Sequence, residues 1–205
     1  KLAAQLGFNG VQFQIEGSNV EGIKDFAARD AQEHLVDYCH SLNMQVTAWV
    51  HELSDLPGPW LPEYLGNVSL TNDKMWAELD ARYEWILTQG IPNVDGLVLT
   101  VVKTQTRVTS TEMMKKLVEL VARKCKEHNK SLIVRTFVWH PEELTGVMGA
   151  VKELDKSTVI MSKAVPQDWQ MRGGNAAEIG DVDGRPQIEE YDVAGEYFLR
   201  NNVAN

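Results

Sequence analysis

Six short segments rich in Val, Ile, Leu and aromatic residues alternate with amphipathic stretches of helical length, and this alternation predicts an α/β fold with a parallel sheet. Polar and aromatic residues crowd the ends of these segments, and no glycine-rich dinucleotide-binding turn follows the first segment. Both features favour a closed barrel over an open doubly wound sheet. We therefore predict a partial (β/α)₈ TIM barrel, with about six of its eight β/α units present.

The six predicted strands are short and apolar, as expected for strands covered by helices. They span residues 11–16, 46–52, 96–102, 132–139, 158–164 and 187–193. Glu189, Glu190 and Asp192 in the last segment are interpreted in part as outward-facing residues of that strand.

Two of the intervening stretches carry clear helix signals. Thr109 stands three residues before Glu112, the spacing of a capping box, and apolar residues then recur on one face. A second helix is predicted over residues 73–88, with Gly90 as the residue that follows its end. Two segments without this periodicity, 53–70 and 167–186, are predicted to be long loops after strand ends, where functional residues commonly lie.

The two ends of the chain resemble pieces of further helices, over residues 1–6 and 196–205. We therefore expect residues 1–205 to form a single barrel domain that is truncated at both ends. The six strands then correspond to the second to seventh of eight, and both edges of the sheet are open.

The composition excludes several classes of function. A formal net charge of -9, with dispersed Lys and Arg, argues against a nucleic-acid partner. No apolar run is long enough to span a membrane, so we expect no membrane partner. Cys39 and Cys125 lie in helical patterns without metal-ligand spacing and are interpreted as buried free thiols. The oligomeric state and the localisation are left undetermined by the sequence.

The predicted strand ends bring together side chains typical of a carbohydrate site. Aromatic rings stack on the C–H faces of sugars, and charged groups bind hydroxyls. A lone Trp at such a place is more often packing, but four of the six Trp lie at or just after strand ends. His51 and His140 have no metal-ligand spacing, so we expect no metal and no cofactor. The candidate substrate-binding residues at this rim include Trp49, His51, Glu52, Trp139 and Trp169.

Residues 159–172, with Lys163, Asp168 and the run Asp168-Trp169-Gln170-Met171-Arg172, followed by Glu196-Tyr197, resemble glycoside hydrolase family 67, the α-glucuronidases. Residues 133–139 and 7–11 also resemble strand motifs of that family. The resemblance implies a (β/α)₈ barrel that cleaves glycosidic bonds of a polysaccharide such as xylan with inversion. It implies that Asp168 and Glu196 activate water, and that Arg135 and Lys163 bind a sugar carboxylate, with Arg172 beside them. An ion pair of Lys163 or Arg135 with Asp168 or Glu196 is the structural alternative.

The chain departs from the family at the fourth strand of the barrel. Thr104 stands where the family has its general acid, and Thr100 stands where it has another substrate-binding Lys. Three explanations follow: another carboxylate such as Glu52 is the acid, the protein acts on substrates with good leaving groups, or the chain is a carbohydrate-binding relative without catalysis. A barrel isomerase or aldolase with Lys163 as a Schiff-base residue is a third possibility, based on fold analogy alone.

Overall fold

The structure is a computed structural model that describes residues 1–14, 29–51, 69–101, 110–137, 141–164 and 178–191. In these ranges six parallel strands form one sheet in sequence order, so that each strand pairs with the next along the chain. The strands are β1 (Gly10–Gln14), β2 (Gln45–His51), β3 (Gly96–Thr100), β4 (Ser131–Arg135), β5 (Val159–Lys163) and β6 (Gln187–Glu190).

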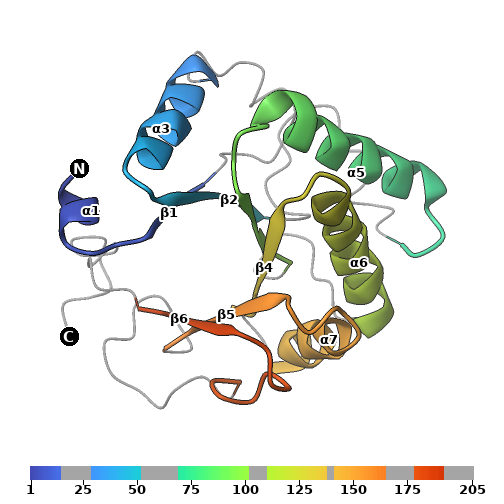
Figure 1. Cartoon of the computed structure of the whole chain (residues 1–205). Helices are drawn as coiled ribbons and strands as arrows, with labels where there is room; N and C mark the ends of the chain where they lie inside the picture. The colour runs from blue at the N-terminus through green and yellow to red at the C-terminus, as the bar shows by residue number, and fades with distance from the viewer. Residues whose placement is uncertain (15–28, 52–68, 102–109, 138–140, 165–177, 192–205) are drawn as a thin grey trace, which may run out of the picture.

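The first helix precedes β1, and the others lie between strands in the sequence and on the outer side of the sheet in space. They are α1 (Leu2–Gln5), α3 (Arg29–Ser41), α5 (Asp73–Trp85) with the π-helical turn η1 (Ile86–Gly90), α6 (Thr111–Glu127) and α7 (Pro141–Lys152). Figure 1 shows the sheet curled, with α3, α5, α6 and α7 around its outer side. Each predicted strand overlaps one observed strand, and the curled half-barrel is consistent with the predicted partial TIM-barrel arrangement.

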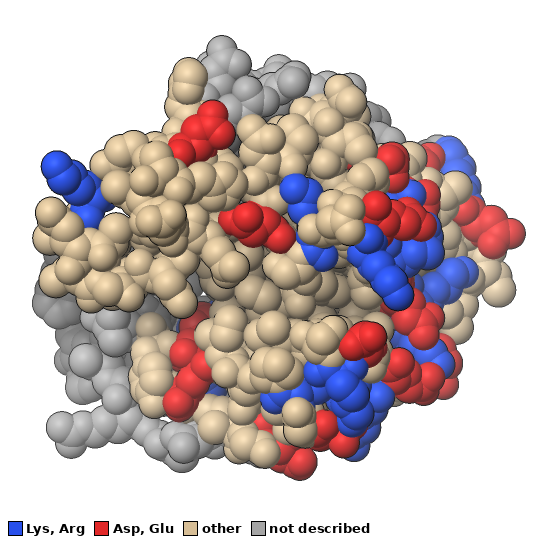
Figure 2. All heavy atoms as spheres, in the orientation of Figure 1, with Lys and Arg blue, Asp and Glu red and all other residues tan. Residues whose placement is uncertain are grey.

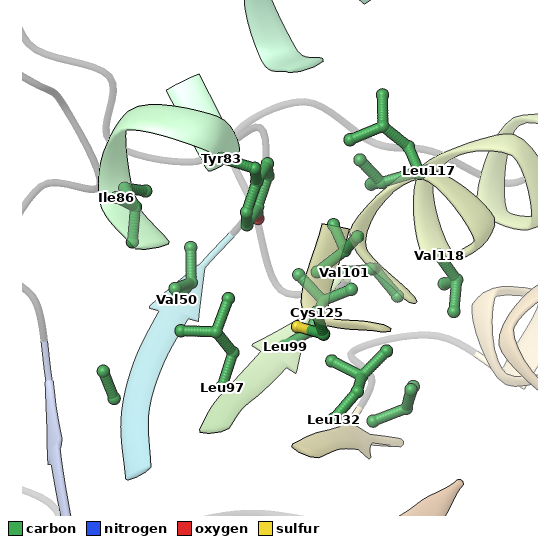
Figure 3. Close-up of a cluster of buried hydrophobic side chains, with 14 of the residues drawn as sticks. Val50, Tyr83, Ile86, Leu97, Leu99, Val101, Leu117, Val118, Cys125 and Leu132 are labelled. Atoms are coloured by element: carbon green, nitrogen blue, oxygen red, sulfur yellow. The ribbon is translucent and has the colours of Figure 1, made fainter. Parts of the chain in front are cut away.

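The main hydrophobic core lies between the outer face of the sheet and the helices. Every second residue of a strand points to this face, which is why Leu97 and Leu99 are both fully buried against α5 and α6. Figure 3 shows these two leucines together with Tyr83 and Ile86 from the α5 region and Leu117 from α6. Burial of this continuous apolar layer is the main stabilising contribution to the fold.

The inner face of the sheet carries a second, smaller apolar layer. Val98, Ile133 and Met161 pack there, with Trp49 and Val159 against them. The register places Trp49, Val98, Ile133 and Val159 in one row across four strands, so these side chains share the face opposite the helices. The residues two positions further along these strands therefore also point to the inner face.

Three helices end in the same way and lead directly into strands. Gly7, Asn43 and Asn129 follow the ends of α1, α3 and α6 with φ angles of 87°, 57° and 55°. After α6, the Lys130 N–H donates to the Cys125 carbonyl at 2.7 Å, and equivalent bonds close α1 and α3. These are Schellman motifs, which favour Gly or Asn at the left-handed position. They start β1, β2 and β4 at the same end of the sheet.

Two predicted helix boundaries differ from the structure. The N-cap of α6 is Ser110, whose hydroxyl accepts a hydrogen bond from the Met113 N–H at 3.3 Å, one residue later than the predicted cap Thr109. Gly90 is the last residue of the π-helical turn rather than a left-handed residue beyond a helix end. A Cβ at Gly90 would lie 2.7 Å from the Trp85 ring, so close packing explains the glycine.

Both cysteines are free and buried in helices, which confirms their interpretation as packed thiols. Burial raises the pKa of the Cys125 thiol to about 12, which makes it a poor nucleophile near neutral pH. Within the described ranges, no helix combines the length and the apolar character needed to cross a membrane.

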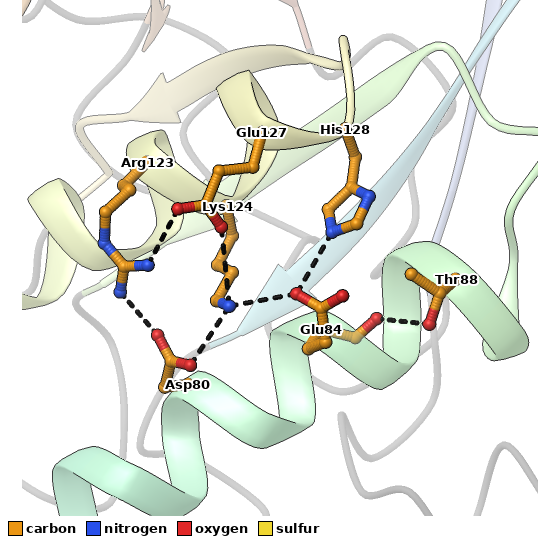
Figure 4. A network of polar contacts seen from close by, with 7 residues as sticks. All are labelled: Asp80, Glu84, Thr88, Arg123, Lys124, Glu127 and His128. Carbon is orange, nitrogen blue, oxygen red and sulfur yellow. Dashed lines mark hydrogen bonds and ion pairs between the residues drawn. The ribbon is translucent and has the colours of Figure 1, made fainter.

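Charged side chains of both signs gather over α5, α6 and α7 on the face seen in Figure 2. Figure 4 shows how Lys124 of α6 joins α5: its Nζ lies 3.0 Å from Asp80 Oδ2 and 2.9 Å from Glu84 Oε2. Burial by itself would lower the pKa of Lys124, but the hydrogen bonds to Glu84 and Asp80 outweigh it and raise the pKa. His128 and Arg123 complete the network from the same helix.

Lys124→Met should make the protein less stable at neutral pH, and the difference from wild type should shrink on acidification. Hydrogen bonds from Lys124 and His128 lower the pKa of Glu84 below its ordinary value of 4.5, so its contribution is present above that pH and is lost as the pH falls. Thermal unfolding from pH 7 down to about pH 3 measures the difference. Lys126→Met, an exposed change on the same helix, is the control. A constant difference across this pH range would contradict the role of the network.

Leu99→Ala should destabilise the protein by about 2 to 5 kcal/mol, because it leaves a cavity in a fully buried site. Leu35→Ala on α3 removes the same atoms from a side chain that is 40% exposed, and it should change stability by no more than about 0.5 kcal/mol. Urea unfolding of both variants tests the assigned core, and equal losses would show that the assignment is wrong.

Candidate functional site

Polar side chains meet on the inner face of the sheet where neighbouring strands end. Thr100, Arg135, Lys163 and Glu190 are the last residues of β3, β4, β5 and β6. The register pairs Thr100 with Arg135, and Lys163 with Glu190. Because paired residues of parallel strands point to the same face, all four side chains leave the sheet on the side of the inner apolar layer.

Arg135 and Glu190 form a bidentate ion pair that spans β5. The Arg135 Nε donates to Glu190 Oε2 at 2.6 Å, and its Nη2 donates to Oε1 at 2.5 Å. The side chain of Arg135 is 6% exposed, whereas that of Glu190 is 20% exposed. Such planar, charge-assisted pairs are among the stronger hydrogen-bonded contacts in proteins. The pair therefore fixes the relative positions of the ends of β4 and β6.

Aromatic rings enclose the guanidinium of this pair. The Arg135 Cζ lies 4.4 Å from the centroid of the Trp49 ring and 4.6 Å from that of Phe137. The cation is attracted to the negative ring faces, and this attraction is strongest where water is excluded. The rings thus hold the guanidinium in one orientation while Glu190 receives two of its N–H groups.

Lys163 is the second cation of the cluster. Its Nζ lies 3.9 Å from Glu190 Oε1 and 4.7 Å from the Phe137 ring centroid, and its side chain is 4% exposed. Glu190 therefore lies between two nearly buried cations. Of these three charged groups, the carboxylate is the one most open to solvent.

Trp49 and His51 border the cluster on β2. The Trp49 indole N–H donates to the Thr100 hydroxyl at 2.7 Å, and the two rings of Trp49 and His51 lie 5.7 Å apart. Thr100 is fully buried, so this bond fixes the tilt of the indole. Trp49 and His51 both remain partly exposed at the rim.

Hydrogen bonds on the outer face hold β5 and β6 in register below the cluster. The Thr136 hydroxyl donates to Glu178 Oε1 at 2.8 Å and lies 3.0 Å from the Ser162 hydroxyl, which accepts a hydrogen bond from the Gln187 amide at 2.9 Å. Glu178 and Ser162 are both buried. Because unmet polar groups are costly in such a place, this network restricts sliding of the strands that carry Lys163 and Glu190.

The structure brings four of the predicted site residues together: Arg135, Lys163, Trp49 and His51. The other predicted site residues lie outside the described residues; they are Asp168, Glu196, Glu52, Trp139, Trp169 and Arg172. Thr104, at the position of the family's general acid, also lies outside them. In the described part of the chain no three His, Cys, Asp or Glu side chains are arranged to hold a metal ion.

Glu190 is the site residue that the sequence interpretation missed. It was grouped with Glu189 as partly outward-facing, and only Glu189 is exposed, where it accepts a hydrogen bond from the Tyr191 hydroxyl. Arg135 forms an ion pair with Glu190, whereas the alternative pairing of Arg135 or Lys163 with Asp168 or Glu196 lies outside the described residues. A usable signal was present, because Glu190 and Ile188 alternate with Glu189 and so share a face of the strand.

No protein-family model and no curated protein matches this chain. Among solved structures, it is similar to "A Glycoside Hydrolase Family 20 beta-N-Acetylglucosaminidase". The similarity is one of fold. The TM-score is 0.55 with 12% sequence identity, and the match covers 92% of this chain and 47% of that one. The chain thus spans about half the length of its structural neighbour, and an identity this low concerns the fold alone. It does not point to family 67.

Arg135→Met and Glu190→Gln should each destabilise the protein, and the double variant should lose less than the sum of the two. Either single change removes the bidentate pair and leaves the other charged group without those two hydrogen bonds, so a coupling energy of about 0.5 to 3 kcal/mol is expected. Urea unfolding of the four proteins measures it. A control cycle that combines Arg135→Met with Glu189→Gln should give a coupling energy near zero. Additive effects of Arg135→Met and Glu190→Gln would exclude a stabilising pair.

Proposed function

We propose that this chain is part of a glycoside hydrolase that acts on an oligosaccharide or polysaccharide by the inverting mechanism of family 67. The observation that carries the proposal is the order Arg135, Lys163, Asp168, Glu196 in the sequence, together with the cluster that Arg135 and Lys163 form at the carboxyl ends of the strands. Active sites of (β/α)₈ barrels lie at this end. The glycosidase-like fold supports the proposal at the level of the reaction class.

In the proposed reaction, Asp168 and Glu196 activate the attacking water. One carboxylate removes a proton from water, which attacks the anomeric carbon from the side opposite the leaving group. A carboxylic acid protonates the leaving oxygen, and Glu52, which follows β2 directly, is the proposed donor. Trp49, Trp139, Trp169 and Arg172 are proposed to contact the sugar.

A second candidate function is carbohydrate binding without catalysis. It is favoured by Thr100, which is fully buried and bonded to Trp49 where the related family has a substrate-binding lysine, and by the threonine at position 104. Ligand-dependent thermal stabilisation without turnover would identify this function.

The hydrolase proposal is tested by reducing-sugar release from a panel of oligosaccharides and polysaccharides. Asp168→Ala and Glu196→Ala should each lower the rate by roughly 10²-fold or more while ligand binding survives, since acid–base groups contribute about 10²- to 10⁴-fold. Glu119→Ala on the exposed side of α6 is a control that should keep full activity. Unchanged turnover in both site variants would end the proposal, and binding without any turnover would favour the second candidate.

A further inference from the structure

The cluster at the ends of β4, β5 and β6 also bears on which sugars this site accepts. Two cations at a strand-end rim suggest a site for an acidic sugar, because charge-assisted bonds to a carboxylate are strong. The structure already contains a carboxylate in that place. Glu190 receives both the Nε and Nη2 groups of Arg135 and lies 3.9 Å from Lys163 Nζ.

We propose that Glu190 is a specificity-determining residue that binds hydroxyl groups of a neutral sugar and excludes uronic acids from this part of the site. The inference rests on the proposed carbohydrate site but not on hydrolysis. The contacts of Arg135, Lys163 and Glu190 carry it.

The first step concerns which charges a ligand can reach. The side chains of Arg135 and Lys163 are 6% and 4% exposed, and Trp49 and Phe137 pack against the guanidinium. Glu190 is 20% exposed. A ligand that approaches this rim therefore meets the carboxylate before it meets either cation.

The second step concerns what the carboxylate can still accept. Its two oxygens offer roughly four lone-pair positions, and Arg135 occupies one on each oxygen. The remaining positions accept O–H groups, which neutral sugars supply on adjacent carbons. Arg135 orients the carboxylate through two hydrogen bonds, and sugar hydroxyls that donate to a carboxylate form charge-assisted bonds.

The third step concerns an acidic sugar. A uronate carboxylate beside Glu190 places like charges together, and it must either displace Glu190 from a bidentate pair or leave water between them. Removing the charge of Glu190 reverses this balance. Arg135 then loses the carboxylate that receives its two N–H groups, and a uronate carboxylate can take that place.

The test compares sugars that differ in one group: methyl glucoside with methyl glucuronide, and methyl galactoside with methyl galacturonide, in both anomers. Binding to the whole chain is measured by calorimetry and by tryptophan fluorescence. The wild-type protein should bind the neutral member of at least one pair tenfold or more tightly than the acidic member. Glu190→Gln should lower this ratio at least tenfold, and Glu189→Gln, on the exposed side of the same strand, should leave it unchanged.

Three results would overturn the inference: tighter binding of the uronides by the wild-type protein, an unchanged ratio in Glu190→Gln, or binding of neither member of any pair. The wild-type comparison decides the matter even where Glu190→Gln fails to fold, and circular dichroism checks folding. Selective binding of neutral sugars without hydrolysis of any glycan would leave this inference standing and would remove the hydrolase proposal. Hydrolysis confined to uronides would overturn this inference and leave the hydrolase proposal standing.

Discussion

The described structure depends on one constraint, the in-sequence parallel pairing of six curled strands, of which the central four, β2 to β5, are buried on both faces. The outer face packs on α3, α5, α6 and α7, and the inner face carries the smaller layer of Val98, Ile133 and Met161. Since side chains alternate between the two faces, a slip of one residue would exchange them. Buried strands of this kind hold their register strongly, and the carboxyl ends then supply a fixed platform for chemistry.

At these strand ends the carboxylate of Glu190 lies beside the two cations Arg135 and Lys163 and offsets their charge. The rings of Trp49 and Phe137 pack against the guanidinium of Arg135, and Glu190 accepts hydrogen bonds from its N–H groups. Lys163 lies close to the same carboxylate. A buried guanidinium requires such compensation, because desolvation of an unpaired charge costs several kcal/mol, on the order of a whole domain's stability. The compensation also changes what the site offers, from a receptor for anions to an acceptor for hydroxyl groups.

The solved structure that this chain resembles is a family 20 glycosidase, and that likeness concerns the fold alone, whereas residues 159–172 resemble family 67 in sequence. A shared barrel is compatible with both, since one fold supports many active sites built from strand ends and loops. The family question therefore depends on Asp168, Glu196 and Glu52 rather than on the sheet. The Arg135–Glu190 pair adds a feature of this chain that neither likeness implies.

Periodicity and local signals in the sequence determined the α/β class, the six strand positions and the burial of Cys39 and Cys125, because each follows from which residues lie on one side of a strand or helix. They also placed Arg135, Lys163, Trp49 and His51 at one end of the sheet. Only the tertiary structure decided that Glu190 is the partner of Arg135, since the curl that brings β4 and β6 within reach across β5 leaves no trace in local periodicity. Two further details likewise depended on atomic contacts that residue types alone do not specify. Ser110 rather than Thr109 is the N-cap of α6, and Gly90 packs closely against the Trp85 ring.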